Sequence, residues 1–234
     1  MFGVLLNSVT ILVGGAIGLL IGEKIPARVR ETVMHGLALA VVLVGLIPAL
    51  KTQDMLCVIV CLVVGALIGE WIDIELRLKR LGERLERLAP KGGGGKPLVP
   101  GFVTASLVFC VGAMAVVGSL ESGLSGNHST LTAKSMLDGV GSVFFAAALG
   151  PGVLLSAAAI FVYQGAIALF AGTIAPVLTE PVVREMSGVG GLLIACIGLN
   201  MLESVRVRVG NLLPGIFLPI VYLPAYALIS ALFG

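Results

Sequence analysis

Long apolar runs follow one another along the chain and are separated by short polar segments. Each run approaches the roughly 20 apolar residues with which an α-helix crosses a bilayer. Seven runs are predicted to be membrane-spanning helices: 2–22, 35–50, 54–71, 101–120, 152–174, 187–203 and 212–233. The pattern therefore predicts an all-α polytopic membrane protein that is surrounded by the lipid bilayer.

An eighth segment, 134–149, is shorter and begins with the charged residues Lys134 and Asp138. If it crosses, the chain has about eight transmembrane helices, and if it re-enters the chain has seven. The composition agrees with a membrane protein, because only 12% of residues are charged, against about 25% in soluble domains. Nothing in the sequence indicates a nucleic-acid partner.

The first run, 2–22, also has to be compared with a cleaved signal peptide. A signal peptide begins with basic residues and has a shorter apolar segment of about 7–15 residues. No Lys or Arg precedes this run, and it is longer than that. We therefore expect it to be a retained first span.

The basic residues predict an orientation, because loops rich in Lys and Arg stay on the cytoplasmic side. With eight crossings, 12 of the 15 basic residues fall on one side. With 134–149 re-entrant, the number is 11 of 15. Eight crossings are thus slightly favoured. They place both termini outside and the segments 23–34, 72–100 and 204–211 in the cytoplasm of a bacterial cell, with the chain in the inner membrane.

Two segments resemble each other at an offset of 150 residues. GAIGLLIGEKIP (15–26) and GAIALFAGTIAP (165–176) share six identical positions. The similarity continues loosely into the next runs, where Gly45 and Gly198 correspond. With eight crossings the two copies have opposite orientation, which is a recurring design of secondary transporters. The predicted organisation is a first repeat of three spans (1–71), a cytoplasmic segment (72–100), connecting spans (101–151) and a second repeat (152–234).

Glycines are predicted to mediate helix packing. Small residues four apart line one face of a helix and let a neighbouring backbone approach closely. Such small faces would also allow a homo-oligomer. The predicted packing glycines are Gly14, Gly18, Gly22, Gly65, Gly69, Gly165 and Gly172. The prolines at 214, 219 and 224 predict a kinked or broken last helix, since each removes a backbone donor.

Polar residues inside apolar runs are the strongest functional indications, because an unpaired polar group at membrane depth is costly. Asp138 is the only carboxylate within such a run. Lys134 lies four residues before it and could form an ordinary ion pair, so a pairing role and a functional role both stay open. Asn7, Gln164 and Asn200 are candidates for a solute or ion pathway, or else bond between helices.

The segment after the third run is amphipathic. Leucines at 78, 81, 85 and 88 alternate with arginines, which predicts a cytoplasmic helix over 72–88, and a glycine-rich hinge follows it. This helix supports an alternative function, a scaffold or sensor that does not transport and that reads lipid charge or recruits a partner.

Catalytic and cofactor signals are weak. The G-x-S-G pattern at 123–126 resembles that of intramembrane serine proteases but lies in a polar loop. The four cysteines lie in apolar runs, where a thiol behaves as a small hydrophobe. We therefore expect no enzyme activity, no metal and no cofactor.

Several motifs together resemble one known family. They are N-S-x-T-I-x-x-G-G-x-I-G-L-L-I-G (7–22), FCVGAMAVVGS (109–119), KSMLDG (134–139), YQG (163–165) and RVGNLLPGIFLP (208–219). The combination is similar to the YqgA/YdfK-like family of bacterial inner-membrane proteins, a domain of unknown function. The resemblance implies location and architecture and adds no substrate. An unknown small solute or ion is the substrate that the transporter hypothesis requires.

Overall fold

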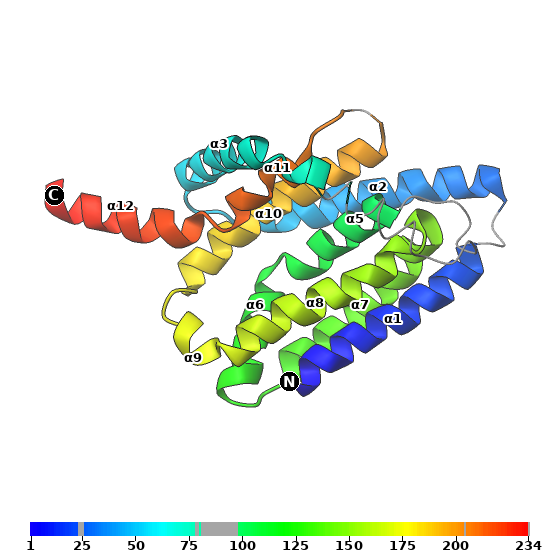
Figure 1. The fold of residues 1–234 in the computed structure, drawn as a ribbon, viewed down its shortest axis with the longest axis horizontal. Coiled ribbons are helices and arrows are strands. Elements are labelled where there is room, and N and C mark those ends of the chain that lie inside the picture. Colours follow the sequence, from blue (N-terminus) through cyan, green and yellow to red (C-terminus); the bar gives the residue numbers. More distant parts are fainter. Residues whose placement is uncertain (23–25, 78–79, 81–97, 204, 234) are drawn as a thin grey trace.

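In the computed structural model, every regular element is helical among the residues it describes, which are 1–22, 26–77, 80, 98–203 and 205–233 (Figure 1). The elements are α1 (Phe2–Gly22), α2 (Ala27–Ala49), α3 (Met55–Ile72), α5 (Leu98–Cys110), α6 (Ala113–Leu124), α7 (Ser129–Leu149), α8 (Gly152–Leu169), α9 (Ala171–Ile174), α10 (Glu180–Met201), α11 (Val209–Leu212), the 3-10 helix η1 (Leu213–Ile216) and α12 (Pro219–Phe233).

Five helices in this part of the chain are long and apolar enough to cross a membrane, namely α1, α2, α3, α8 and α10. The number rises to seven if each of two bent pairs, α5 with α6 and α11–η1 with α12, forms one span. α7 is not among them, because its N-terminal half is too polar. With 21 residues it is nevertheless as long as α1 and extends five residues further toward the N-terminus than predicted.

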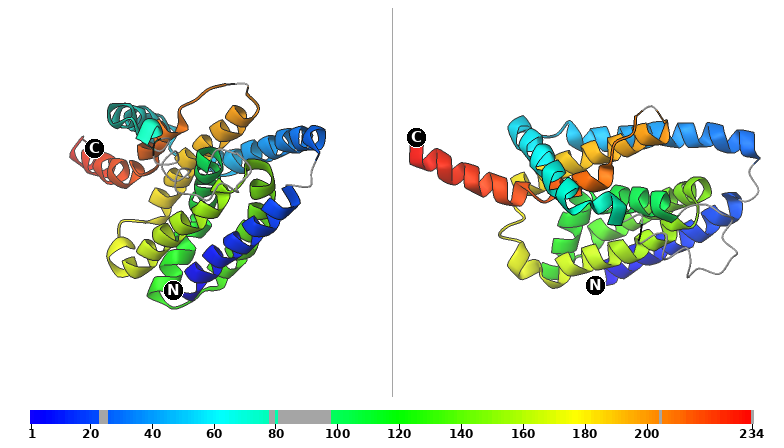
Figure 2. Two further views of the ribbon diagram at one scale, coloured as in Figure 1. Left: turned by 45° about the vertical axis from the view of Figure 1, so that its right-hand side comes forward. Right: turned by 45° about the horizontal axis from the view of Figure 1, so that its top comes forward.

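Two groups of helices make up the body (Figures 1 and 2). One group contains α1, α5, α6, α7 and α8, and the other contains α2, α3, α10, α11 and η1. α12 projects from the second group, and its residues from Pro224 to Ser230 are exposed. The chain alternates between the groups, so segments distant in sequence pack together.

α1 packs along α7 in parallel, with glycines at the contact. A Cβ at Gly14 would overlap the carbonyl oxygen of Gly139, and one at Gly18 would overlap that of Val143. One turn further on, a Cβ at Gly22 would lie 2.7 Å from the carbonyl oxygen of Ala147. The predicted glycine face of the first helix is thus a surface on which two backbones touch.

The other predicted glycines differ in their surroundings. Gly65 faces the backbone of Gly215, and Gly69 faces that of Asn211, so α3 packs closely on α11 and η1. Gly165 lies in ordinary contact with Met1 and Val4. Gly172 has no neighbour among the described residues within 4 Å of the Cβ position, because α8 has already ended at Leu169 and the chain has turned into α9.

α2 and α10 form an antiparallel pair that also depends on glycine. Gly45 faces the backbone of Gly191 and Ala195, whereas Gly198 faces that of Ala38 and Val42. Each helix therefore contributes a glycine that receives the backbone of the other, and the two contacts mirror each other.

Two of the predicted spans are broken. The run 101–120 bends by 62° between α5 and α6, where Gly112 has φ +128°, a backbone conformation that favours glycine. The last run bends by 46° between η1 and α12, as its prolines predict. Pro214 lies at the start of η1, and Pro224 lies inside α12.

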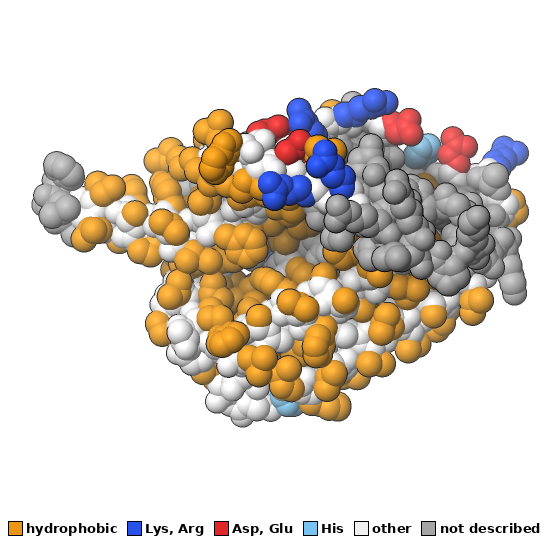
Figure 3. Space-filling view, in the orientation of Figure 1, with side chains coloured by type: hydrophobic (Ala, Val, Ile, Leu, Met, Phe, Trp, Pro, Cys, Tyr) orange, Lys and Arg blue, Asp and Glu red, His pale blue; other side chains and the backbone are white. Residues whose placement is uncertain are grey.

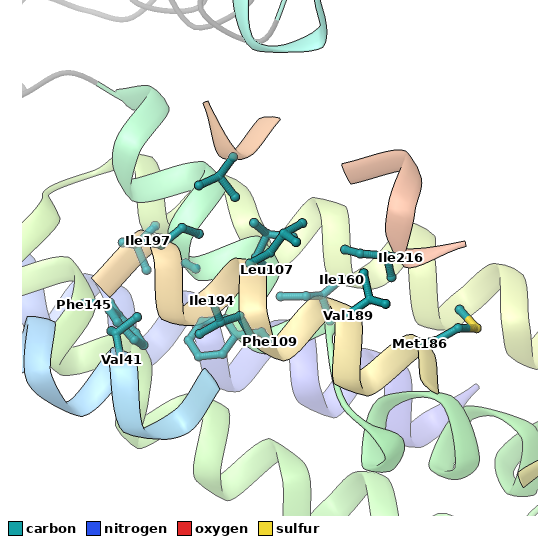
Figure 4. Packing of buried hydrophobic residues seen from close by; sticks show 14 of the residues in the cluster. Val41, Leu107, Phe109, Phe145, Ile160, Met186, Val189, Ile194, Ile197 and Ile216 are labelled. Carbon is teal, nitrogen blue, oxygen red and sulfur yellow. The ribbon is translucent and has the colours of Figure 1, made fainter. Parts of the chain in front are cut away.

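A single large apolar core joins the two groups of helices (Figure 4). Phe109 and Phe145 meet edge to face in it, with ring centroids 5.7 Å apart, and they pack near Val41 and Ile194. The outer surface is also apolar, while the charged side chains seen in Figure 3 gather along one edge. A molecule that is apolar both inside and outside is suited to lipid as its solvent.

One end of the molecule collects most of the arginines whose side chains are described: Arg28, Arg77, Arg80, Arg206 and Arg208. We call it the arginine-rich end. α1, α3, α7 and α10 finish there, and α2 and α5 begin there. The predicted amphipathic helix over 72–88 starts at this end, but most of it, at 78–79 and 81–88, lies outside the described residues, as does the segment 89–97 that follows.

Candidate functional site

Three helices bring three of the four predicted pathway residues into one buried cluster. Asn7 of α1 donates from Nδ2 to Oδ2 of Asp138 on α7 at 3.0 Å, and to Oε1 of Gln164 on α8 at 3.2 Å. Asn7 and Gln164 are fully buried, and Asp138 is 5% exposed. The amide of Asn7 therefore links a carboxylate and a second amide at the meeting point of α1, α7 and α8.

Lys134 is the fourth member of this polar cluster. Its Nζ lies 3.0 Å from Oδ1 and 2.9 Å from Oδ2 of Asp138, one helical turn away. Both side chains are buried, so the predicted ion pair is present but lies inside the protein instead of at its surface. Breaking a buried pair by removing one partner costs about 3–5 kcal/mol.

Small residues around the cluster let these side chains reach one another. Gly139 follows Asp138 and faces Thr10 of α1, and Gly165 follows Gln164 and faces Val4. Larger residues at these positions would separate the helices. Because the backbones lie so close, an asparagine side chain is long enough to join α1 to both α7 and α8.

Two polar atoms of the cluster have no hydrogen-bond partner among the residues that the structure describes. They are Oδ1 of Asn7, an acceptor, and Nε2 of Gln164, a donor. The orientation of the Asn7 amide follows from its neighbours, since the carboxylate of Asp138 requires the NH2 group to face it. The cluster thus offers a solute or water molecule one hydrogen-bond acceptor and one donor, beside an ion pair that has no net charge.

An apolar layer closes the cluster toward the end opposite the arginine-rich end. Val4, Leu131 and Ala168 form a small buried group on the same three helices. Val4 precedes Asn7 by three residues, and Ala168 follows Gln164 by four, so the layer lies one turn from the polar cluster. Beyond it His128 bonds to Ser122, with Nδ1 and Oγ 2.9 Å apart, and its ring packs against that of Phe2 at an interplanar angle of 50°.

Asn200, the remaining pathway candidate, lies elsewhere. Its Nδ2 donates to the carbonyl oxygen of Val207 at 2.8 Å, and its Oδ1 accepts from the Val207 backbone N–H at 2.9 Å. Asn200 therefore clamps the turn after α10. It also lines a cavity of about 840 Å³ at the arginine-rich end, together with Thr104, Leu149 and Ile197.

Glu185 is a buried carboxylate that the sequence did not single out. It is 1% exposed, and it accepts hydrogen bonds from the Thr52 hydroxyl, from the Gln53 backbone N–H at 3.1 Å and from Nε of Arg184 at 3.1 Å. Because the apolar run begins only at 187, Glu185 was placed outside it. α10 begins earlier, at Glu180, and this extension buries the carboxylate.

The described cysteines and other potential ligands form no metal centre. Cys57 and Cys61 lie one turn apart on α3 with their Sγ atoms 3.8 Å apart. No group of three or more His, Cys, Asp or Glu side chains suited to a metal ion occurs among the residues that the structure describes.

The apolar helices and the buried polar cluster define a polytopic helical membrane protein. The chain belongs to a family of proteins of unknown function, DUF554, whose model matches residues 2–223. It is 31% identical over 225 residues to the uncharacterized membrane protein YdfK of Bacillus subtilis (strain 168), with 94% of each chain covered. It is 28% identical over 219 residues to the uncharacterized protein YqgA of Escherichia coli (strain K12), with 92% of this chain and 93% of YqgA covered. No solved structure matches the chain significantly. The resemblance that the motifs indicated is thereby confirmed.

Proposed function

We propose that this protein is a secondary transporter that carries a small polar solute or an ion across the bacterial inner membrane, and that it acts without catalysis. The polar cluster of Asn7, Lys134, Asp138 and Gln164 is its binding site. The observation that carries the proposal is the pair of unbonded atoms on Asn7 and Gln164, both fully buried. A buried polar group without a partner costs about 1–3 kcal/mol, so these atoms require a ligand or water.

The directions of the helices support an inverted repeat. α1 and its predicted counterpart α8 are antiparallel, since Asn7 meets Gln164 while Gly15 faces Leu154. α1 runs parallel to α7, and α8 runs parallel to α5 and α6, as shown by Gly101 beside Val153 and Gly123 beside Ala168. The two counterparts, α1 and α8, thus each have a neighbouring helix that runs parallel to them, as a two-fold axis in the membrane plane would produce.

Contacts in the other group of helices follow the same symmetry. Gly198 lies 153 residues (198 minus 45) after Gly45. The same shift relates the residues that the two glycines face, because Ala38 and Val42, beside Gly198, correspond to Gly191 and Ala195, beside Gly45. Gly65 meets Gly215, which lies 150 residues (215 minus 65) away, as expected close to a symmetry axis.

This symmetry requires eight crossings, with α7 as one of them. The parallel course of α7 beside α1 supports this number, because a re-entrant segment would not follow a spanning helix over its full length of roughly 30 Å. In this topology both termini lie outside. The arginine-rich end then faces the cytoplasm, in agreement with the distribution of basic residues.

A solute screen tests the proposed function. Purified protein would be heated with a panel of small polar solutes and inorganic ions, because a ligand that binds only the folded state raises the thermal midpoint. Solutes that stabilise the protein would then be tested for uptake into proteoliposomes. Stabilisation and uptake are expected to disappear in Asp138→Asn and Gln164→Ala.

Val140→Ala is a matched control, because Val140 lies two residues from Asp138 but is 61% exposed on the outer face of α7. This variant should bind and transport like the natural chain. A solute that stabilises all four proteins equally would bind elsewhere. If a broad panel yields neither stabilisation nor uptake, the protein is not a transporter of these solutes.

A further inference from the structure

One face of α7 carries a sequence of distinct layers from end to end. Leu131, Asp138, Phe145 and Leu149 are spaced by seven, seven and four residues, so they lie in line on the helix. Leu131 belongs to the apolar layer, Asp138 to the polar cluster, and Leu149 to the wall of the large cavity. Phe145 therefore stands between the cavity and the polar cluster.

The cavity is large enough to hold a solute. Its volume is about 840 Å³, within the range of roughly 300–1,000 Å³ that is usual for small-molecule sites. Its walls come from α2, α5, α7 and α10 and from the segments after α3 and after α10, and they include Thr104 and Ile197. All these wall residues lie toward the arginine-rich end.

Phe109 of α5 packs against Phe145 of α7 at the same depth in the molecule. Its ring meets that of Phe145 at an interplanar angle of 74°, and both side chains are buried, at 2% and 7% exposure. Thr104, at the cavity, precedes Phe109 on α5 by five residues, and the Phe109 ring lies beside Gly141, three residues after Asp138 on α7. On both helices the aromatic residue thus separates the cavity from the polar cluster.

A glycine on α7 makes room for the Phe109 ring beside Phe145. Gly141 lies on α7 between Asp138 and Phe145, and a Cβ there would be 3.3 Å from Cε1 of Phe109. The missing side chain lets the Phe109 ring lie against α7. Figure 4 shows both rings beside Val41 and Ile194, that is, where the two groups of helices meet. Both rings belong to the first group, whereas Val41 and Ile194 belong to the second, so a change in the relative position of the groups would uncover the rings.

We propose that the cavity is the water-filled vestibule through which solute reaches the polar cluster from the arginine-rich end, and that Phe109 and Phe145 form the gate between them. The inference rests on the proposed function for its solute, whereas the route itself is tested without any solute. The structure is then closed at both sides of the polar cluster, by this gate and by the layer of Val4, Leu131 and Ala168.

Cysteine accessibility tests the route. In a background in which the four native cysteines are replaced by alanine, single cysteines are introduced as Val103→Cys at the cavity and Ser135→Cys beside Lys134. A membrane-impermeant methanethiosulfonate is applied to spheroplasts and, separately, to inverted vesicles. Arg28→Cys marks the face of the arginine-rich end. The Val103→Cys protein is expected to react from that same face, and the Ser135→Cys protein to be protected from both.

Removal of one ring should open the gate. Phe145→Ala is expected to raise the modification rate of the Ser135→Cys protein by at least about tenfold from the face of the arginine-rich end. Phe144→Ala is the matched control, because Phe144 is its neighbour but is 58% exposed on the outside of α7. It should leave the rate unchanged. Phe145→Leu, which keeps much of the apolar volume, should give an intermediate rate if Phe145→Ala does not fold.

Two results would overturn the inference. The first is an unreactive Val103→Cys protein, since the cavity would then hold no water. The second is a Ser135→Cys protein whose rate is unaffected by Phe145→Ala and Phe145→Leu while both stay folded. If accessibility follows the expectation but the solute screen finds nothing, the route stands and the proposed transport fails, so the two failures are distinguishable.

Discussion

At the scale of single residues, the buried ion pair has the largest expected effect on stability. Lys134→Met would leave the Asp138 carboxylate buried with only Asn7 as a partner. We expect this to cost about 3–5 kcal/mol, seen as a much lower thermal midpoint in detergent.

The double variant Lys134→Met/Asp138→Leu is the control for this effect. It removes both charges and should recover most of the lost stability, because an apolar pair of similar size often replaces a buried ion pair without cost. It should still bind no solute. A single variant as stable as the natural chain would show that the pair is unimportant for folding.

Glu185 supports a second prediction about a single residue. Glu185→Gln keeps the shape but presents an NH2 group to donors that need an acceptor, namely the Gln53 backbone N–H and Arg184. We expect a loss of about 1–3 kcal/mol in the free energy of unfolding. Glu180→Gln, at an exposed position of the same helix, should cause little change in the thermal midpoint. Equal midpoints for the two variants would contradict the proposed tie between α10 and the turn after α2.

At the scale of helices, close packing of α1 on α7 is the feature most sensitive to substitution. Gly18→Val would insert a side chain where the carbonyl group of Val143 lies, and backbone cannot give way as a side chain can. We expect a loss of about 1–3 kcal/mol or more, and a protein that elutes as aggregate in size-exclusion chromatography. Gly36→Val adds the same side chain to α2, where no described atom outside the local helix lies within 4 Å of the Cβ position, and should leave the elution profile unchanged. Normal elution of both variants would contradict the close contact.

The helices also show how far the sequence predicts the structure. Apolar runs identified the long helices because lipid demands apolar side chains over their whole length. The same criterion missed the bend at Gly112, since a turn inside an apolar run changes no hydropathy. It also misjudged the start of α7, whose first turn is polar.

For the candidate site, polar side chains inside apolar runs were a sufficient indication for Asn7, Asp138 and Gln164. Asn200 satisfied the same criterion but lies near a helix end, where it bonds the backbone of Val207. Only the folded chain distinguishes these cases, because the course of the segment after α10 decides which partner the amide meets.

At the scale of the whole molecule, the position of the C-terminus decides the topology. Two reporters would be fused after Gly234, one active only in the cytoplasm and one active only outside it. Eight crossings with α7 spanning predict activity of the outside reporter. Activity of the cytoplasmic reporter would mean an odd number of crossings and would remove the inverted repeat as an argument for transport. A fusion after Asp73, in the predicted cytoplasmic segment, is the control and should give the opposite result.

The polar first half of α7 has a consequence for how the protein is made. A lysine and an aspartate at the centre of an inserting helix each add roughly 2.5–3.5 kcal/mol to the cost of insertion, so α7 is poorly equipped to enter the bilayer by itself. Its ion pair forms within the helix, but Asn7 belongs to α1, which is synthesised before α7. We therefore expect α1 to stay beside the insertion machinery until α7 emerges, so that the earlier helix receives the polar half of the later one.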